Sequence, residues 1–451
     1  MKQYLQYLAA ALPLMGQAAG QQVGKEQSET HPKMSWKKCT GSASCSTVSA
    51  EVVIDANWRW LHTSGTTKNC YDGNKWTSAC TSSTDCAEKC ALEGATYQKT
   101  YGASTSGDAL TLKFLTKGDY GTNIGSRFYL MNGASKYQMF TLMDNEFTFD
   151  VDLSKVDCGL NAALYFVAME EDGGMAKYSA NKAGAKYGTG YCDGQCARDL
   201  KFVGGKANFD GWKASSNDPN AGVGPYGACC AEIDVWCSNA YSFAFTPHAC
   251  VDNKYHVCET TGCGGTYSDD RFSGDCDANG CDYNPYRMGN PDFYGKGKTV
   301  DTTKKFTVVS RFEKNKLTQF MVQGGKKIEI PAPKIDGVPS DSSAITPEFC
   351  EAQPKAFGDR NRFSEVGGFD QLNQALSVPM VLVMSLWDDH YANMLWLDST
   401  YPPDKAGQPG AARGDCAQDS GVPADVESKS ANAQVIYSNI RFGPVGSTVA
   451  V

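Results

Sequence analysis

Hydrophobic and polar residues alternate one by one in several short stretches of the chain, and this period of two is typical of β-strands. In EFTFDVDL, residues 146–153, apolar side chains fall on one face, opposite acidic and hydroxyl side chains. Similar β-rich runs are LTLKFL, RFYLM, ALYFVAM, KFTVVSRF and QVIYSNIRF. VPMVLVMSLW is more continuously apolar, which favours a strand buried on both faces. The pattern predicts a mainly β protein built on antiparallel sheet.

Long segments rich in glycine, asparagine, aspartate and serine separate these runs, notably residues 204–228, 259–298 and 400–425. Loops of this length in a compact domain usually carry function. Because no linker, internal repeat or low-complexity tail is visible, we expect one domain over residues 21–451.

The first 20 residues, MKQYLQYLAAALPLMGQAAG, combine a lysine, a short apolar run and small residues. This arrangement is typical of a secretory signal peptide cleaved after Ala19 or Gly20, and an N-terminal core helix is the alternative. The apolar run is too short to span a bilayer. We therefore expect a secreted, extracellular protein.

Nineteen cysteines in a secreted chain indicate disulfides. Metal binding is the competing interpretation of CDGQC and of the Cys229–Cys230 pair, but an oxidising compartment and the lack of matched histidines disfavour it. The odd count leaves at least one thiol unpaired or bonded to another molecule. The run that starts at Asp275 resembles the opening of a calcium loop, but Tyr286 replaces the required glutamate, so we predict no metal site.

The formal net charge of −8 argues against nucleic acid or an anionic membrane surface as a partner. A neutral polymer fits this charge better than a phosphorylated one. We expect a monomer without a cofactor.

The candidate chemistry lies in CCAEIDVWCSNAYSFAFTPHAC, residues 229–250. Retaining glycoside hydrolysis needs two carboxyl groups about 5–5.5 Å apart, one as nucleophile and one as acid/base. Glu232 and Asp234 share one face of a strand, and a third acid three residues further on joins them only if a β-bulge turns it inward. That third position is Cys237. Taken alone, such a pair is more often a solvated strand face than a catalytic site.

This run resembles the signature of fungal cellulases of glycoside hydrolase family 7, the cellobiohydrolase I type, in which C-C-x-E-x-D-x-W-E precedes T-P-H-x-C. Further segments are similar in order and spacing over essentially the whole mature chain: VVIDANWRWLH, AGAKYGTGYCDGQCARDLKF, CGGTYSDDRF, CDYNPYRMG, MSLWDDHYANMLWLDSTYP and SNIRFGP. The resemblance implies a concanavalin A-like antiparallel β-sandwich, or jelly roll, whose long loops form a substrate tunnel.

The resemblance also implies roles for individual residues. Glu232 matches the nucleophile, Asp234 the carboxylate that supports it by a hydrogen bond, and His248 a neighbour of the site. The acid/base glutamate of the family falls on Cys237. The family's disulfide pattern leaves Cys237 unpaired and implies nine bonds: 39–45, 70–90, 80–86, 158–416, 192–230, 196–229, 250–276, 258–263 and 281–350.

The substrate-binding residues follow from the same resemblance. A pyranose ring stacks its C–H face on an aromatic side chain, and a tunnel needs several such surfaces. For a single tryptophan core packing is the commoner role, and for a single arginine a surface charge is. The matched positions are the platforms Trp58, Trp60, Trp387 and Trp396, the product-site cations Arg271 and Arg287, and the polar residues Arg127, Tyr165, Asp193, Gln195 and Arg413.

The segments 204–228 and 264–274 have full length, whereas endo-acting relatives have them shortened. This implies an enclosed tunnel that releases cellobiose from the ends of β-1,4-glucan chains. Separately, we expect a catalytic domain without a cellulose-binding module.

The thiol changes the expected chemistry, because a general acid works best with a pKa near the operating pH and a free cysteine titrates near about 8.5. We expect a retaining cellulase-type hydrolase whose native activity is strongly reduced. The first alternative is a catalytically silent glucan-binding protein that keeps the tunnel. The second, a lectin or structural sandwich without a glucan role, conflicts with the series of tryptophans.

Overall fold

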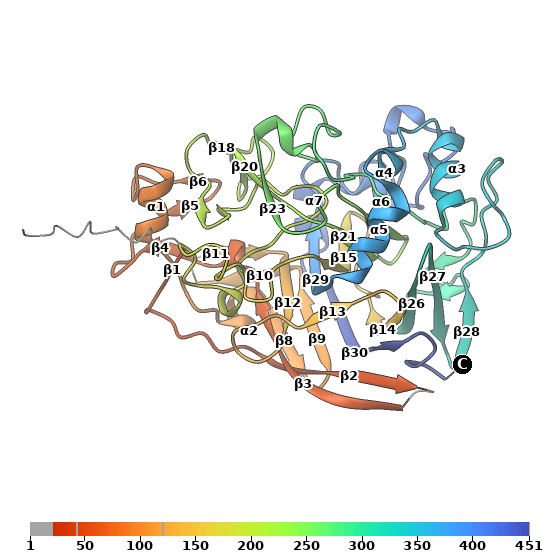
Figure 1. The fold of residues 1–451 in the computed structure, drawn as a ribbon, viewed down its shortest axis with the longest axis horizontal. Helices are drawn as coiled ribbons and strands as arrows, with labels where there is room; N and C mark the ends of the chain where they lie inside the picture. The colour runs from red at the N-terminus through yellow and green to blue at the C-terminus, as the bar shows by residue number, and fades with distance from the viewer. Residues whose placement is uncertain (1–20, 42–43, 120, 451) are drawn as a thin grey trace, which may run out of the picture.

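The computed structural model describes residues 21–41, 44–119 and 121–450. The expected signal peptide lies outside these residues. Strands account for 37% of the structure and helices for 14%, which confirms the mainly β prediction (Figure 1).

Fifteen strands of the described residues form one hydrogen-bonded set, and nearly all of its neighbours run antiparallel. One half consists of β22 (Phe243–His248), β21 (Glu232–Ser238), β15 (Leu160–Val167), β29 (Pro379–Asp388), β12 (Ser126–Met131), β3 (Ser44–Ile54) and β13 (Met139–Thr141). The other half consists of β2 (Lys33–Gly41), β30 (Gln434–Pro444), β14 (Asn145–Asp152), β26 (Phe306–Glu313), β27 (Lys316–Gln323), β28 (Lys326–Glu329), β9 (Ala109–Lys113) and β8 (Ala103–Ser106).

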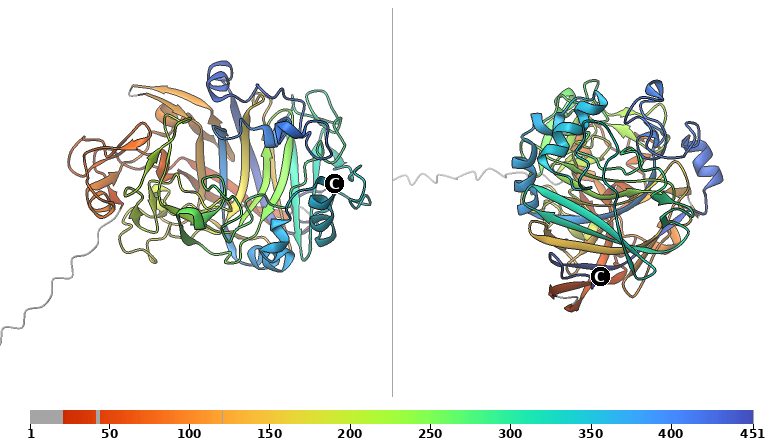
Figure 2. Two further views of the ribbon diagram at one scale, coloured as in Figure 1. Left: turned by 90° about the horizontal axis from the view of Figure 1, so that it is seen from above. Right: turned by 90° about the vertical axis from the view of Figure 1, so that its right-hand side faces the viewer.

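The two halves fold over each other into a β-sandwich (Figure 2). The Tyr437 hydroxyl on β30 donates to the Ala163 carbonyl of β15 at 3.2 Å. The ring of Phe147 on β14 meets that of Phe166 on β15 at a centroid distance of 4.9 Å. Aromatic contacts of this kind add about 0.5–1.5 kcal/mol to the free energy gained by burying apolar surface. The expected jelly-roll sandwich is therefore confirmed.

The alternating segment 146–153 corresponds to β14, but its polar face is buried as well. Glu146 is fully buried and accepts hydrogen bonds from Arg311 Nε at 2.6 Å and from the backbone amide of Thr448 at 3.1 Å. The C-terminal segment covers this face, and the paired carboxylate makes its burial tolerable. The run VPMVLVMSLW forms β29, which is buried on both sides between β15 and β12, as its composition predicts.

The period-two analysis did not predict the helices, although local signals mark some of them. α3 (Pro347–Phe357) begins at Thr346, whose hydroxyl accepts from the Phe349 amide at 3.2 Å, and ends at Gly358 in the left-handed region. The other helices are α1 (Ser83–Lys89), α2 (Tyr97–Tyr101), α4 (Arg362–Glu365), α5 (Gly368–Ser377), α6 (Leu395–Asp398) and α7 (Pro423–Lys429), with 3₁₀ turns η1 (Ala56–Trp58), η2 (Ala185–Tyr187), η3 (Thr260–Cys263) and η4 (Pro403–Lys405). None of the helices in the described ranges has the length and hydrophobicity to cross a membrane.

Small sheets of two or three short strands lie within the long connecting segments. They are β1 (Gln22–Val23), β4 (Leu61–Thr63) and β7 (Cys90–Leu92); β5 (Tyr71–Asp72) with β6 (Lys75–Trp76); β10 (Leu115–Gly118) with β11 (Gly121–Ile124); β16 (Phe202–Val203) with β17 (Lys206–Ala207); β18 (Lys213–Ala214) with β19 (Gly222–Val223); β20 (Tyr226–Cys229) with β23 (His256–Glu259); and β24 (Tyr294–Gly295) with β25 (Val300–Asp301). All nine disulfides implied by the family pattern are formed, and Cys237 is the free cysteine of the described residues.

Candidate active site

A β-bulge in β21 brings the three candidate catalytic positions to one face. Ile233 pairs with Phe166 and Trp236 pairs with Leu164, so three steps on β21 match two steps on β15. The register with β22 shifts at the same place. The extra residue resets the alternation, and Trp236 turns into the core while Cys237 joins the face of Glu232 and Asp234. The bulge expected from the spacing is therefore confirmed.

The bulge is tied to the opposite layer of the sandwich. The Val235 carbonyl accepts a hydrogen bond of 2.9 Å from Nε2 of Gln319 on β27. The same amide nitrogen also lies 2.9 Å from Oγ of Ser310, its cross-strand neighbour. A carbonyl displaced from the regular ladder thus keeps a partner, as a buried backbone group requires.

Strand register collects the other candidates on the same face. Cys237 pairs with Ala163 on β15 and with Ala244 on β22, and Ala163 pairs with Ser385 on β29. Cross-strand partners point to one face of a sheet. The partners of these residues on the adjacent strands, and the residues two positions away on each strand, share this face. They are Arg127, Asn161, Tyr165, Glu232, Asp234, Cys237, His248 and Trp387.

Glu232 is 7% exposed and accepts a hydrogen bond of 3.0 Å from the Gly194 amide. Burial, followed by the negative charges of Asp234 and Asp193, raises its pKa well above that of an ordinary glutamate. Two disulfides, Cys192–Cys230 and Cys196–Cys229, tie the Gly194 loop to the residues that precede Glu232. The amide is therefore held in place beside the carboxylate.

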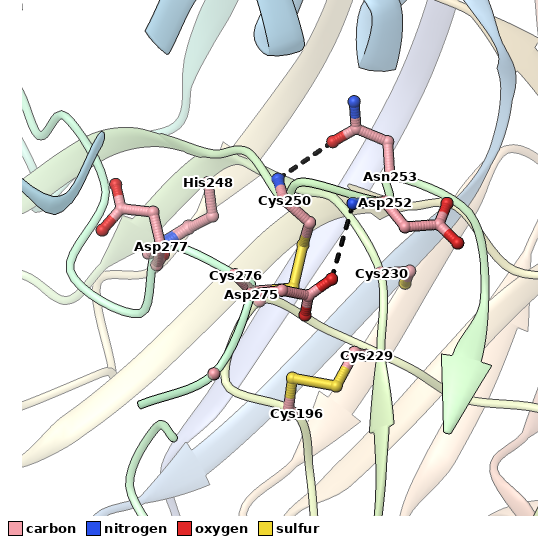
Figure 3. The surroundings of a disulfide bond; sticks show 12 residues. Cys196, Cys229, Cys230, His248, Cys250, Asp252, Asn253, Asp275, Cys276 and Asp277 are labelled. Atoms are coloured by element: carbon pink, nitrogen blue, oxygen red, sulfur yellow. Dashed lines mark hydrogen bonds between the residues drawn. A yellow bond between two sulfur atoms is a disulfide. The ribbon is translucent and has the colours of Figure 1, made fainter. Parts of the chain in front are cut away.

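His248 lies between Asp234 and a backbone carbonyl. Its Nε2 is 3.2 Å from Asp234 Oδ2, and its Nδ1 is 2.7 Å from the Asp277 carbonyl, next to the Cys250–Cys276 disulfide (Figure 3). Burial alone would lower the pKa of His248, but the hydrogen bond and charge of Asp234 raise it to about 10. We infer an imidazolium that donates from both nitrogens. Asp234 supports this cation in addition to facing Glu232.

Cys237 is 5% exposed, and its pKa is raised well above that of an ordinary thiol by burial and then by the charge of Asp234. The group is consequently a neutral thiol over the whole range in which carboxylates titrate. Asn161, fully buried on the neighbouring strand, accepts from the Ser238 amide through Oδ1 at 2.9 Å, and its side chain also interacts with the Cys237 thiol, where it acts to lower the thiol pKa.

The polar substrate-binding candidates next to this site form a connected group. The Tyr165 hydroxyl lies 3.0 Å from that of Tyr191, and the Arg127 guanidinium stacks on the Tyr191 ring at 3.3 Å. Arg127 also donates to Asp55 at 3.0 Å. Burial raises the pKa of Asp193 to about 6.

The four tryptophans occupy three different environments. Trp387 and Trp396 stack at a centroid distance of 6.4 Å, and Trp396 Nε1 donates to Asp389 at 3.0 Å. Trp58 lies under the Arg127 guanidinium, 5.3 Å from its ring centroid, which joins it to the group around Tyr191. Trp60 is 38% exposed, and its ring stacks on that of His62 at a centroid distance of 4.1 Å. Trp60 is thus exposed, whereas Trp58, Trp387 and Trp396 are partly buried.

The remaining candidates lie beyond the catalytic positions. Gln195 and Arg271 both donate to the Ala278 carbonyl, at 2.5 and 2.7 Å. The Arg287 guanidinium is almost completely buried and donates to Asp282 at 2.5 Å and to Asp359 at 2.8 Å. A third donor, Arg287 Nε, lies 2.9 Å from the Gly410 carbonyl, and the product-site role of Arg287 stays a prediction. Burial, with the nearby charge of Arg287, lowers the pKa of Arg413 to about 10, and Arg413 Nε lacks a hydrogen-bond partner.

Sequence reasoning missed three contributors: Asn161, Tyr191 and Gly194. A Cβ at Gly194 would lie 2.8 Å from the His248 Cβ and 3.3 Å from Glu232 Oε2, so only glycine fits there without displacement. Spacing along the chain does not mark Asn161, because its place follows from strand register: it stands two residues before Ala163, which pairs with Cys237.

Glu232, Asp234 and His248 hold potential ligand atoms within 4.8 Å of one another. Asp234 Oδ2 lies 3.2 Å from His248 Nε2, at hydrogen-bond distance, and His248 Nδ1 lies 2.7 Å from the Asp277 carbonyl, so both ring nitrogens already have partners.

Comparisons with known proteins identify relatives of this chain. The chain is 73% identical to a cellobiohydrolase from Melanocarpus albomyces, solved in complex with cellotetraose, with a TM-score of 0.94 over 95% of this chain and 100% of that one. A family 7 cellobiohydrolase from Daphnia pulex is 46% identical, with a TM-score of 0.93 and the same coverage. The native Humicola insolens endocellulase EGI is 34% identical, with a TM-score of 0.80 and again 95% and 100% coverage. The sequence model described as glycosyl hydrolase family 7 matches residues 23–449. This chain therefore belongs to glycosyl hydrolase family 7.

Proposed function

We propose that this protein binds β-1,4-glucan chains of the cellulose type and forms a glycosyl-enzyme on Glu232, with retention of configuration over the complete reaction. The carrying observation is the β21 bulge, which places Glu232, Asp234 and position 237 on one face beside Trp387. The cellotetraose complex of the 73% identical relative supports the substrate class.

In the first step, a Glu232 oxygen attacks the anomeric carbon as the bond to the leaving oxygen breaks, and the electron pair leaves with that oxygen. The leaving sugar needs a proton, which the group at position 237 supplies in the family pattern. Attack requires the ionised form of Glu232; burial raises the pKa of this carboxyl, whereas the charge of His248 and the hydrogen bond from the Gly194 amide act in the opposite direction and favour the carboxylate.

The Cys237 thiol is poorly suited to donate this proton. A proton donor must release its proton as charge develops on the leaving group, and the pKa of this thiol lies above even the ordinary cysteine value. We therefore propose that the native chain hydrolyses unactivated glucans slowly. The same thiol cannot deprotonate the water that releases the glycosyl-enzyme.

The surroundings of position 237 fit a larger, oxygen-bearing side chain. Its cross-strand neighbours, Ala163 and Ala244, are small. The Asn161 side chain already interacts with the Cys237 thiol, and its amide nitrogen can donate to a carboxylate placed there. The defect that we propose is therefore confined to one side chain within an otherwise complete site.

Loop contacts support an enclosed, chain-end mode of action. The amide of Asn217, between β18 and β19, donates to the His390 carbonyl, and the rings of Tyr267 and Tyr391 meet at 5.2 Å. Both contacts join the segment after β29 to the loops 204–228 and 264–274. The family resemblance implies that these loops are shortened in endo-acting relatives. The TM-scores, 0.94 and 0.93 to cellobiohydrolases against 0.80 to an endocellulase, point the same way. The nine disulfides support an extracellular location.

The second candidate is a glucan-binding protein without hydrolysis, which the buried neutral thiol of Cys237 favours. Both candidates predict binding, but only the first predicts a covalent adduct on Glu232.

The test is cellobiose release from cellulose under reducing conditions by three proteins: the native chain, Cys237→Glu and Cys237→Ser. Release by Cys237→Glu alone supports the site and nucleophile as assigned. Inactivity of all three contradicts the assignment, provided that their unfolding temperatures agree. Equal release by all three shows that another group donates the proton.

A further inference from the structure

A second cluster of ionisable side chains lies at the end of β29, outside the proposed active site. It consists of Asp388, the last residue of the strand, His390 in the turn that follows, and Glu427 on α7. These residues hold potential ligand atoms within 4.8 Å of one another although 37 positions separate His390 from Glu427. They come from two pieces of chain, the end of β29 with the turn after it and helix α7, and their ligand atoms converge on one point.

The hydrogen bonding of His390 orients its free nitrogen toward the two carboxylates. Its Nδ1 lies 2.8 Å from the Asn217 carbonyl, which can only accept, so Nδ1 carries the proton. In the neutral ring Nε2 then holds a lone pair. That atom lies 3.7 Å from Asp388 Oδ2 and 3.7 Å from Glu427 Oε1, too far for hydrogen bonds. A backbone carbonyl that fixes the tautomer in this way is typical of metal-binding histidines.

Asp388 supplies an independent indication of a ligand. The residue is only 9% exposed, and its Oδ2 is buried without a hydrogen-bond partner. A buried carboxylate oxygen with no partner is costly, and in native proteins such groups usually have a partner that includes ions. This oxygen is the one that faces His390 Nε2.

We propose that Asp388, His390 and Glu427 bind one divalent first-row transition-metal ion, for which Zn²⁺ is the probe. Bonds of about 2.0–2.2 Å to nitrogen and oxygen put neighbouring tetrahedral ligands about 3.3–3.5 Å apart. The observed 3.7 Å separations need adjustments of only a few tenths of an ångström. One imidazole and two carboxylates, with water completing the shell, suit Zn²⁺ better than Ca²⁺, which prefers six to eight oxygen ligands.

Such an ion would connect parts of the chain that hold the candidate platforms. Trp387 immediately precedes Asp388, and Asp389 accepts from Trp396. His390 is also joined to Asn217 by two hydrogen bonds. The ion would therefore tie α7 to the end of β29 and, through His390, to the loop between β18 and β19.

The test is calorimetric titration of the metal-free protein with Zn²⁺, together with the visible spectrum after addition of Co²⁺. We expect one ion per chain, with affinity reduced at least tenfold in His390→Gln and in Glu427→Gln. Asp425→Asn is the matched control, because this carboxylate lies on the same helix but pairs with Lys429. Cys237→Ser should bind as the native chain does and should show the same Co²⁺ bands, since no thiolate takes part.

Zn²⁺ should also raise the unfolding temperature of the native chain and of Asp425→Asn, but not that of Glu427→Gln. If His390→Gln fails to fold, Glu427→Gln decides, since this half-exposed side chain lies on the surface of a short helix. The proposal is overturned if the native chain shows no saturable binding. It is also overturned if both ligand variants bind as the native chain does, or if binding is lost in His248→Gln instead.

Discussion

Replacement of Cys237 by glutamate should change the rate by a factor that depends on the leaving group. With an unactivated sugar as leaving group, a positioned general acid contributes about 10²–10⁴ in rate, equivalent to about 2.7–5.4 kcal/mol of activation free energy. With 2,4-dinitrophenolate, which leaves without a proton, the glycosylation rates of the two proteins should agree within about tenfold. The structure favours the upper part of the first range, because burial and Asp234 hold the thiol proton firmly.

The assay is stopped-flow release of dinitrophenolate from an aryl cellobioside, alongside steady-state cellobiose release from cellulose. The native chain should show a burst of one dinitrophenolate per molecule followed by a slow phase, because Cys237 cannot activate the attacking water either. Mass spectrometry should find the cellobiosyl adduct on the peptide that contains Glu232. Azide, a nucleophile that needs no base, should accelerate the slow phase of the native chain and leave Cys237→Glu unaffected.

Two results would refute this reasoning. Equal rate ratios for the activated and the unactivated substrate would mean that position 237 does not deliver the proton. A missing burst in a protein that binds cellotetraose would mean that Glu232 is not the nucleophile, and the glucan-binding alternative would then stand.

Three further predictions concern the framework of the site. His248 has a pKa of about 10 in the folded protein against about 6.5 when unfolded, so its ion pair stabilises the fold fully below about pH 6.5 and loses this effect as the pH rises toward 10. The difference in unfolding free energy between the native chain and His248→Asn should be about 2–4 kcal/mol at pH 6 and should shrink steadily above pH 7. Urea titrations at several pH values measure this difference. A difference that grows with pH would contradict the ion pair. Gly280→Ala should lower the unfolding free energy by about 1–3 kcal/mol more than Gly297→Ala does. Both glycines have φ +72°, but a Cβ at Gly280 would lie 2.3 Å from Thr246 Cγ2, whereas a Cβ at Gly297 would meet nothing within 4 Å. Equal losses would show that the backbone conformation alone is responsible. Trp396→Ala should weaken cellotetraose binding about tenfold in calorimetry, and unchanged affinity at unchanged stability would remove Trp396 from the platforms.

The sequence allowed the sheet to be predicted, because alternation on strands such as β14 and the apolar run of β29 follow directly from side-chain burial. It did not indicate that Glu146 is buried, since the segment that covers it lies 300 residues further along the chain. Helix α5 begins at Gly367 and Gly368 without a capping side chain, so no local signal marks its start.

Some features of the candidate site could be predicted from the sequence, and others could not. The spacing of Glu232, Asp234 and Cys237 required a bulge, and the disulfide pairing came from the family resemblance. The contributions of Asn161 and Tyr191 depend on strand register and on loop packing, which spacing along the chain does not contain. The cluster of Asp388, His390 and Glu427 likewise depends on where α7 packs.

The hydrogen bond from Gln319 to the Val235 carbonyl has a consequence for how this protein loses function on heating. The displaced backbone that aligns Glu232 with position 237 is fastened to a side chain of the opposite layer. A register shift at the site would therefore break this hydrogen bond, and separation of the two layers would remove it. Cellotetraose binding and the folded structure should be lost together in one cooperative transition. The fraction of the protein that still binds cellotetraose after heat treatment should therefore equal the fraction that remains folded.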